Sequence, residues 1–95
     1  MQMARKPVSP AIAPAEWSEH DAYAIKALVT GTANEGQQKR AINWIISAAA
    51  KTYDVSFSPV SDRETSFAEG RRFVGLQVVK LINMPAELLK GRKPE

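Results

Sequence analysis

The sequence predicts a small all-α protein with three main helices, over about residues 19–30, 33–52 and 62–83, and a short C-terminal helical turn. Two observations lead to this fold class. Short polar motifs that begin helices precede the three segments, and each segment carries apolar residues at the spacing of one helix face. At 95 residues, the chain has the length of a single domain.

Helix starts are marked by three motifs that place a hydroxyl three residues before a carboxylate. They are S-E-H-D at 18–21, T-A-N-E at 32–35 and S-D-R-E at 61–64. In such a capping box, each side chain satisfies a backbone N–H that the first turn of a helix leaves unpaired. One match carries little weight, but three that each open an apolar-periodic segment predict three helices.

The predicted core is made of one apolar stripe from each helix. The stripes are Ala22, Ile25, Leu28 and Val29 in the first helix; Ile42, Ile45, Ile46, Ala49 and Tyr53 in the second; and Phe67, Val74, Val78, Leu81 and Ile82 in the third. Gly31 is predicted to end the first helix in a left-handed conformation. Pro85 is predicted to follow the third helix and to open the short last turn, which Gly91 closes.

The segment between the second and third helices alternates Tyr53, Val55 and Phe57 with polar residues, which is typical of a strand. A lone strand has no neighbour to pair its backbone groups. We therefore expect an extended connector that holds its aromatic side chains against the core.

Two basic tails flank the helical domain, which is expected over residues 16–90. A Pro/Ala-rich arm over 1–15 is predicted to be flexible, and residues 91–95 form the second tail. The net charge of +3 comes from these ends, because residues 16–89 hold eight Lys and Arg against nine Asp and Glu. The folded core therefore lacks the basic excess that is typical of DNA-binding folds.

Composition excludes several classes of site. No apolar run is long enough to span a membrane, and prolines interrupt the N-terminal stretch where a signal peptide needs an apolar segment, so we expect no membrane association and no secretion. The absence of cysteine excludes a disulfide framework and a thiolate nucleophile. His20, the single histidine, is expected to be exposed in the first turn of a helix. We predict no catalytic residue, no metal site and no cofactor.

Trp44 points away from the predicted core stripe of the second helix and lies beside Arg40 and Lys51. An aromatic ring flanked by cations can stack on a nucleic-acid base or anchor a protein interface. The alternative is that the N-terminal arm or the 53–60 connector covers the ring. These three residues are candidates for binding a partner.

Arg71 and Arg72 lie between two glycines in the middle of the third helix, in the segment E-G-R-R-F-V-G at 69–75. Glycine inside a helix costs about 1 kcal/mol relative to alanine, so we expect another helix to pack closely there. Arg71 falls near the middle of the apolar stripe, where it either has a structural role, paired with a carboxylate or lying at the core edge, or binds a partner. The carboxylates that could reach it are Asp21, Glu35 and Glu64.

Two blocks, GTANEGQQKRAINWII and RETSFAEGRRFVGLQVVKLINM, resemble a family of small tailed-bacteriophage proteins first named from a Bordetella phage. The similarity covers about residues 31–84. It depends on the Gly-Thr…Gly opening at 31–36 and on Glu-Gly-Arg-Arg at 69–72, and the chain departs from the family pattern by carrying Asn-Glu at 34–35. The resemblance implies a phage origin, a role in the virion, in packaging or in host interaction, and no enzymatic activity.

We therefore expect a non-enzymatic protein of the host cytoplasm or the virion that acts by binding a phage structural protein or a host protein. The alternative is a nucleic-acid-binding module linked to DNA packaging or regulation. Self-association into a homo-oligomer stays open. The tail cations available for phosphate contacts are Arg5, Lys6, Lys90, Arg92 and Lys93.

Overall fold

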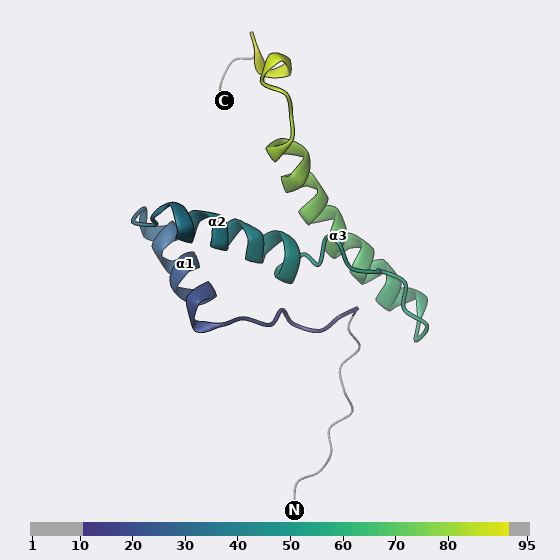
Figure 1. The fold of residues 1–95 in the computed structure, drawn as a ribbon. Helices are drawn as coiled ribbons and strands as arrows, with labels where there is room; N and C mark the ends of the chain where they lie inside the picture. The colour runs from purple at the N-terminus through teal and green to yellow at the C-terminus, as the bar shows by residue number, and fades with distance from the viewer. Residues whose placement is uncertain (1–10, 92–95) are drawn as a thin grey trace, which may run out of the picture.

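The computed structural model describes residues 11–91 and confirms the all-α fold class, with no strand among these residues (Figure 1). The elements are α1 (Glu19–Thr30), α2 (Glu35–Asn43), the π-helical segment η1 (Trp44–Ala49), α3 (Asp62–Ile82) and the short 3-10 helix η2 (Ala86–Leu89). Residues 1–10 and 92–95 lie outside the described residues, and with them Arg5, Lys6, Arg92 and Lys93.

The first predicted helix has both of its predicted ends. Ser18 and Asp21 form a complete capping box: the Asp21 N–H donates to Ser18 Oγ at 3.3 Å, and the Ser18 N–H donates to Asp21 Oδ2 at 2.9 Å. Gly31 ends α1 with φ 74°, and the next N–H, of Thr32, donates to the Ala27 carbonyl at 2.9 Å. The left-handed glycine satisfies carbonyls that the last turn would otherwise leave unpaired.

The second helix does not begin as predicted. Its N-cap is Asn34, which forms a capping box with Gln37, and α2 therefore starts at Glu35. Thr32, which the sequence assigned as the capping hydroxyl, lies 2.9 Å from the Thr30 hydroxyl at the end of α1. Asparagine caps a helix as well as a hydroxyl residue does, so the box could move two residues along the chain.

The second helix continues from α2 into η1 with a change of hydrogen-bond register. The Ala50 N–H donates to the Ile45 carbonyl at 2.9 Å, an i→i+5 bond. Each such bond adds a residue to the turn, so a stripe drawn with α-helical spacing drifts off the core face. The helix also ends at Ala49, three residues before the predicted end at 52, so Tyr53 lies in the connector. Ile46 is buried as predicted, whereas Ile42 and Tyr53 are exposed, and their assignment to the core was wrong.

The core of the described residues is made of small side chains. It comprises Ile46 with Ala24, Ala41, Ala50 and Ala68. Large residues that the sequence placed in the core are exposed instead: Leu28, Val29, Phe67, Val74, Leu81 and Ile82. Alanine and glycine at the contacts let helix backbones approach closely, which turns the larger side chains outward.

The third helix begins and ends close to the prediction. Ser61 Oγ accepts from the Glu64 N–H at 3.2 Å, which is half of the predicted capping box. The Glu64 carboxylate does not close the box, because it accepts from the Ser58 hydroxyl at 3.4 Å. Pro85 precedes η2, and Gly91 has the left-handed φ of 81° that the sequence indicated.

The connector between η1 and α3 forms neither helix nor strand, as expected. Its aromatic side chains do not lie against the core: Tyr53 and Phe57 are exposed, and that part of the prediction was wrong. The buried connector residues are the polar Thr52 and Ser58. Thr52 donates its hydroxyl to the Ile46 carbonyl at 2.7 Å, and the N–H of Ser58 donates to the Thr65 hydroxyl at 2.8 Å.

Residues 11–17, which we call the docked arm, run from the start of α1 alongside α2 and η1 towards α3 (Figure 1). The C-terminal half of α3 and η2 extend away from α1 and α2 in the same view. α1 packs on α2, and α3 contacts the rest of the fold mainly at η1 and the connector.

Gly75 allows α3 to approach the end of η1. A Cβ at this position would overlap Thr52 Oγ1 and would lie 2.9 Å from the Cβ of Ala50. Gly75 is buried, and Thr52 is only 1% exposed, so neither side of the contact has room to relax. This contact confirms that a second segment packs closely against one of the two mid-helix glycines.

Gly75→Ala should therefore destabilise the protein by about 1–2 kcal/mol, because overpacking outweighs the higher helix propensity of alanine. The measurement is the free energy of unfolding in urea. Gly36→Ala is the matched control, since its Cβ would meet only Asn34 Oδ1, at 3.4 Å. We expect that control to be neutral or slightly stabilising. Equal stabilities for the two variants would contradict the close contact at Gly75.

Candidate functional site

Arg40 joins α2 to the start of α1. Its Nε lies 2.9 Å from Asp21 Oδ1, and its Nη2 donates to Ser18 Oγ at 3.1 Å. The backbone N–H of Ser18 contributes most to holding the pKa of Asp21 below its usual value, and the Ser18 hydroxyl and the Arg40 guanidinium add to it. The capping box that starts α1 thus also positions the Arg40 side chain.

Trp44 lies one turn after Arg40 and is half-buried. Its indole Nε1 donates to the Glu16 carbonyl at 2.9 Å. The hydrogen bond fixes the docked arm to the α2–η1 helix through Glu16, one residue after the predicted 1–15 arm, and leaves the ring partly exposed.

A small cavity of about 280 Å³ lies beside this hydrogen bond; we call it the tryptophan pocket. It is lined by Trp17, Asp21, Ala22, Ile25, Lys26 and Trp44. Trp17 lies on the docked arm and is 69% exposed, so one of the two indole rings is available at the surface. Ligand sites typically have volumes of about 300–1,000 Å³. This cavity is slightly smaller, and its size suits a single side chain.

Sequence reasoning missed Trp17. It directly precedes the N-cap Ser18, and Ala22 is the fourth residue of α1. Apolar residues at these two positions often pack together as a hydrophobic staple, which fixes the angle at which the chain enters the helix. Both line the tryptophan pocket. The staple was therefore the sequence signal that could have identified Trp17.

Lys51 lies at the other end of η1, away from Arg40 along the helix. Its φ of 50° is left-handed, and the following N–H, of Thr52, donates to the Ile46 carbonyl at 3.1 Å. Lys51 Nζ lies 4.0 Å from Asp54 Oδ2. With Arg71 and Arg72 it lines a cavity of about 40 Å³. The structure therefore separates the candidate residues into two groups, one at each end of the η1 helix.

The two mid-helix arginines bind backbone carbonyls at the end of η1 and in the connector that follows it. Arg71 Nε donates to the Ala49 carbonyl at 2.6 Å, and Arg72 Nε donates to the Thr52 carbonyl at 3.0 Å. The carbonyls at a helix C-terminus carry partial negative charge, so cations are favoured there. Arg72 Nη1 also lies 3.2 Å from Glu69 Oε1.

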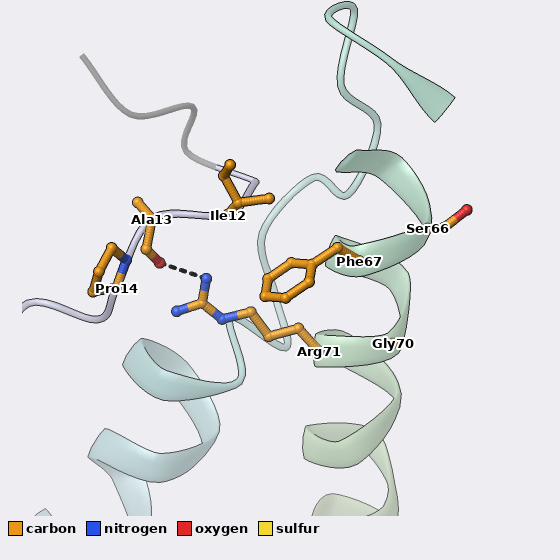
Figure 2. A pocket seen from close by; sticks show the side chains of 7 residues that line it. All are labelled: Ile12, Ala13, Pro14, Ser66, Phe67, Gly70 and Arg71. Carbon is orange, nitrogen blue, oxygen red and sulfur yellow. Dashed lines mark hydrogen bonds between the residues drawn. The ribbon is translucent and has the colours of Figure 1, made fainter. Parts of the chain in front are cut away.

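Arg71 also reaches the docked arm: its Nη1 donates to the Ala13 carbonyl at 2.6 Å (Figure 2). The predicted carboxylate partner was wrong, because within residues 11–91 this half-buried guanidinium donates to the backbone carbonyls of Ala13 and Ala49. The three carboxylates considered for it have other contacts, in Asp21–Arg40, Glu35–Lys39 and Glu64–Ser58. The structure instead shows Arg71 in the other predicted structural role, at the edge of the core.

An open groove of about 580 Å³ separates the docked arm from α3. Figure 2 shows Phe67 and Arg71 directed from α3 towards the arm, with Gly70 on the same helix. The groove is lined by Ile12, Ala13, Pro14, Ser66, Phe67, Gly70 and Arg71. The hydrogen bond from Arg71 to Ala13 crosses this space.

Within residues 11–91, no three His, Asp or Glu side chains gather closely enough to hold a metal ion. His20 is exposed in the first turn of α1, where the sequence placed it. The described helices include none with the length and apolar character that a bilayer-spanning segment needs. No family model, curated protein or solved structure matches the chain.

Arg71→Ala should lower stability by about 2 kcal/mol, because it removes two hydrogen bonds from a charged donor. It should also release the docked arm, which amide hydrogen exchange of residues 11–17 measures directly. Arg72→Ala is the matched control, because the hydrogen bonds of the Arg72 guanidinium go to Thr52 and Glu69. If both variants accelerate exchange in the arm equally, Arg71 is not what holds it.

Asp21 should make the fold sensitive to acid. Its folded-state pKa lies below the unfolded value of about 3.9, so its stabilising effect is present above that value and is lost as the pH falls through the folded-state pKa. Asp21→Asn should lower the urea midpoint at neutral pH and flatten its fall between about pH 4 and pH 2. The pKa of Glu69 is also lowered, by hydrogen bonds from Ser56 and Arg72. Part of the acid dependence of stability therefore remains in the Asp21→Asn variant. A profile parallel to that of the wild type would contradict this role of Asp21.

Proposed function

We propose that this protein is a non-enzymatic binding module, and that it binds a partner protein through the tryptophan pocket. The observation that carries the proposal is the pairing of an exposed Trp17 with a half-buried Trp44 around an apolar cavity. Tryptophan is among the residues most enriched at the energetic centres of protein interfaces. The expected ligand is one apolar side chain of the partner, inserted between the two rings.

The pocket also has the rim that an interface needs. Asp21 and Lys26 stand at its edge, and Arg40 is joined to Asp21. A hydrophobic centre with charged residues around it is the usual arrangement of a protein–protein contact. The hydrogen bond from Trp44 to Glu16 holds the arm in place before the partner arrives, which reduces the entropy lost on binding.

The charge pattern favours a protein over a nucleic acid. Of the candidate cations, Arg40, Lys51, Arg71 and Arg72 each contact a carboxylate or a backbone carbonyl of the chain itself. Binding to phosphates would have to compete with these contacts. Nucleic acid stays the second candidate because the net charge of +3 comes from the chain ends, where Lys90 is exposed among the described residues.

The setting we propose is that of a tailed bacteriophage, with a partner from the virion, its assembly or the host. The support for this setting is the resemblance of the segments 31–36 and 69–72 to the phage family. The nucleic-acid alternative would place the same chain in DNA packaging or regulation.

The test is capture of the partner from host lysate at about 0.3 M salt, where screening weakens contacts between exposed charges. Trp17→Ala should lose the partner that the wild type retains, and should keep the same helical far-UV spectrum. Val60→Ala, which truncates an exposed apolar residue of the connector that does not line the tryptophan pocket, is the matched control and should still bind.

The competing class is tested in parallel with fluorescently labelled duplex DNA. If tail phosphate contacts alone provide affinity, log affinity should fall against log salt with a slope no steeper than about −4, and a chain of residues 11–91 should not bind. Sequence-selective binding of DNA by residues 11–91 at the higher salt would replace the protein-binding proposal with the nucleic-acid one.

A further inference from the structure

α3 carries an apolar face that is largely exposed, although Phe67 and Gly70 also line the open groove beside the docked arm. The face consists of Phe67, Gly70, Val74 and Leu81, and we call it the α3 apolar face. Its large side chains are 53%, 59% and 68% exposed, respectively. The side of α3 that does pack, at Ala68 and Gly75, lies about a third of a turn away around the helix.

The small core makes this exposure costly. Four alanines and Ile46 are the buried apolar residues between positions 11 and 91, while eighteen large apolar side chains in the same range are exposed. A domain of this size normally buries well over half of the surface that its unfolded chain exposes. The fold as a single chain is therefore short of buried apolar area, and the α3 apolar face is a continuous surface on which that area can be gained.

Gly70 gives an independent indication that a helix backbone packs on this face. A Cβ at Gly75 would overlap Thr52, but a Cβ at Gly70 would meet nothing within 4 Å. The single chain thus provides no packing reason for a glycine in the middle of a 21-residue helix. Glycine is favoured where another backbone approaches closely. Gly70 lies between Phe67 and Val74 on the exposed face, where such an approach would occur.

The charges of α3 fit an antiparallel copy of the same helix. Asp62 in the first turn and Lys80 in the last are both exposed, and they lie eighteen residues apart, or five helical turns, on the same flank. Two antiparallel copies place Asp62 of each beside Lys80 of the other. The midpoint of this register is residue 71, next to Gly70, so the charges and the glycine indicate the same crossing point.

We propose that two copies of this chain pair through their α3 apolar faces, antiparallel, with their Gly70 residues at the crossing. The three large side chains of the face offer on the order of 350 Å² per copy, and Ile12 across the groove adds to this. A standard interface takes about 800 Å² from each partner, so this area is that of a weak, reversible dimer. The pairing uses a surface other than the tryptophan pocket and does not depend on the proposed function.

The first test is the molar mass from sedimentation equilibrium of the full chain. The wild type should be a dimer at about 100 µM, and Val74→Glu should be a monomer, because it places two carboxylates in the apolar contact. Gly70→Leu should also be a monomer with unchanged helical content, since each chain has open space at that position. Val29→Glu, an exposed residue of α1, is the matched control and should remain dimeric, as should Trp17→Ala.

The second test separates a second copy from any other occupant. Asp62→Lys alone should raise the dimer dissociation constant about three- to tenfold, because it replaces two opposite-charge pairs by like-charge pairs. The double variant Asp62→Lys with Lys80→Asp should restore dimerisation, because each copy then supplies the opposite charges in the same register.

Three results would overturn the proposal. They are a monomeric wild type at that concentration, a dimer that survives both Val74→Glu and Gly70→Leu, and a charge-swapped double variant that dimerises no better than Asp62→Lys. If Trp17→Ala no longer captures the partner but keeps the molar mass of a dimer, both the dimer and the protein-binding proposal are supported.

Discussion

The close contact between α3 and the end of η1 is the constraint on which the rest of the structure depends. It requires a glycine at position 75, because a side chain there would overlap Thr52. The contact brings Arg71 within reach of the Ala49 carbonyl of η1 and Arg72 within reach of the Thr52 carbonyl, and it brings α3 within reach of the docked arm. Without it, few contacts would join α3 to the α1–α2 pair. One small residue therefore holds the two parts of the chain together.

The helices could be predicted from the sequence because their ends are local. The capping box at 18–21, the left-handed Gly31 and the Ser61 cap each depend on residues within one turn, and the structure contains all three. The core could not be predicted in the same way. The i→i+5 register of η1 is not visible in an apolar pattern, and packing through alanine and Gly75 places the large apolar residues outside. A stripe of large apolar residues shows which face is apolar, but not whether that face is buried within one chain.

The candidate site was predictable in part for a related reason. The capping analysis identified Ser18 and Asp21, and the pattern of the second helix singled out Arg40 and Trp44. What the sequence could not show is that these residues meet, because Arg40 reaches Asp21 across nineteen positions. Trp17 was within reach of sequence reasoning, as the residue that precedes the N-cap. The contacts of Arg71 with backbone carbonyls were not, because any carbonyl can accept and the sequence does not distinguish one from another.

The docked arm has a consequence for the order of folding. Arg71 donates to Ala13 across 58 positions of the chain, and to Ala49 across 22. Closing the longer loop loses more chain entropy, and the carbonyl of Ala13 has a guanidinium to bind only after α3 has docked on η1. We therefore expect the Arg71–Ala13 contact to form late and to be absent from the folding transition state, whereas the arm's hydrogen bond from Trp44 to Glu16 does not require α3. A contact that forms late acts on the unfolding rate, so the link from Arg71 to the arm determines how long the folded state lasts more than how fast it forms.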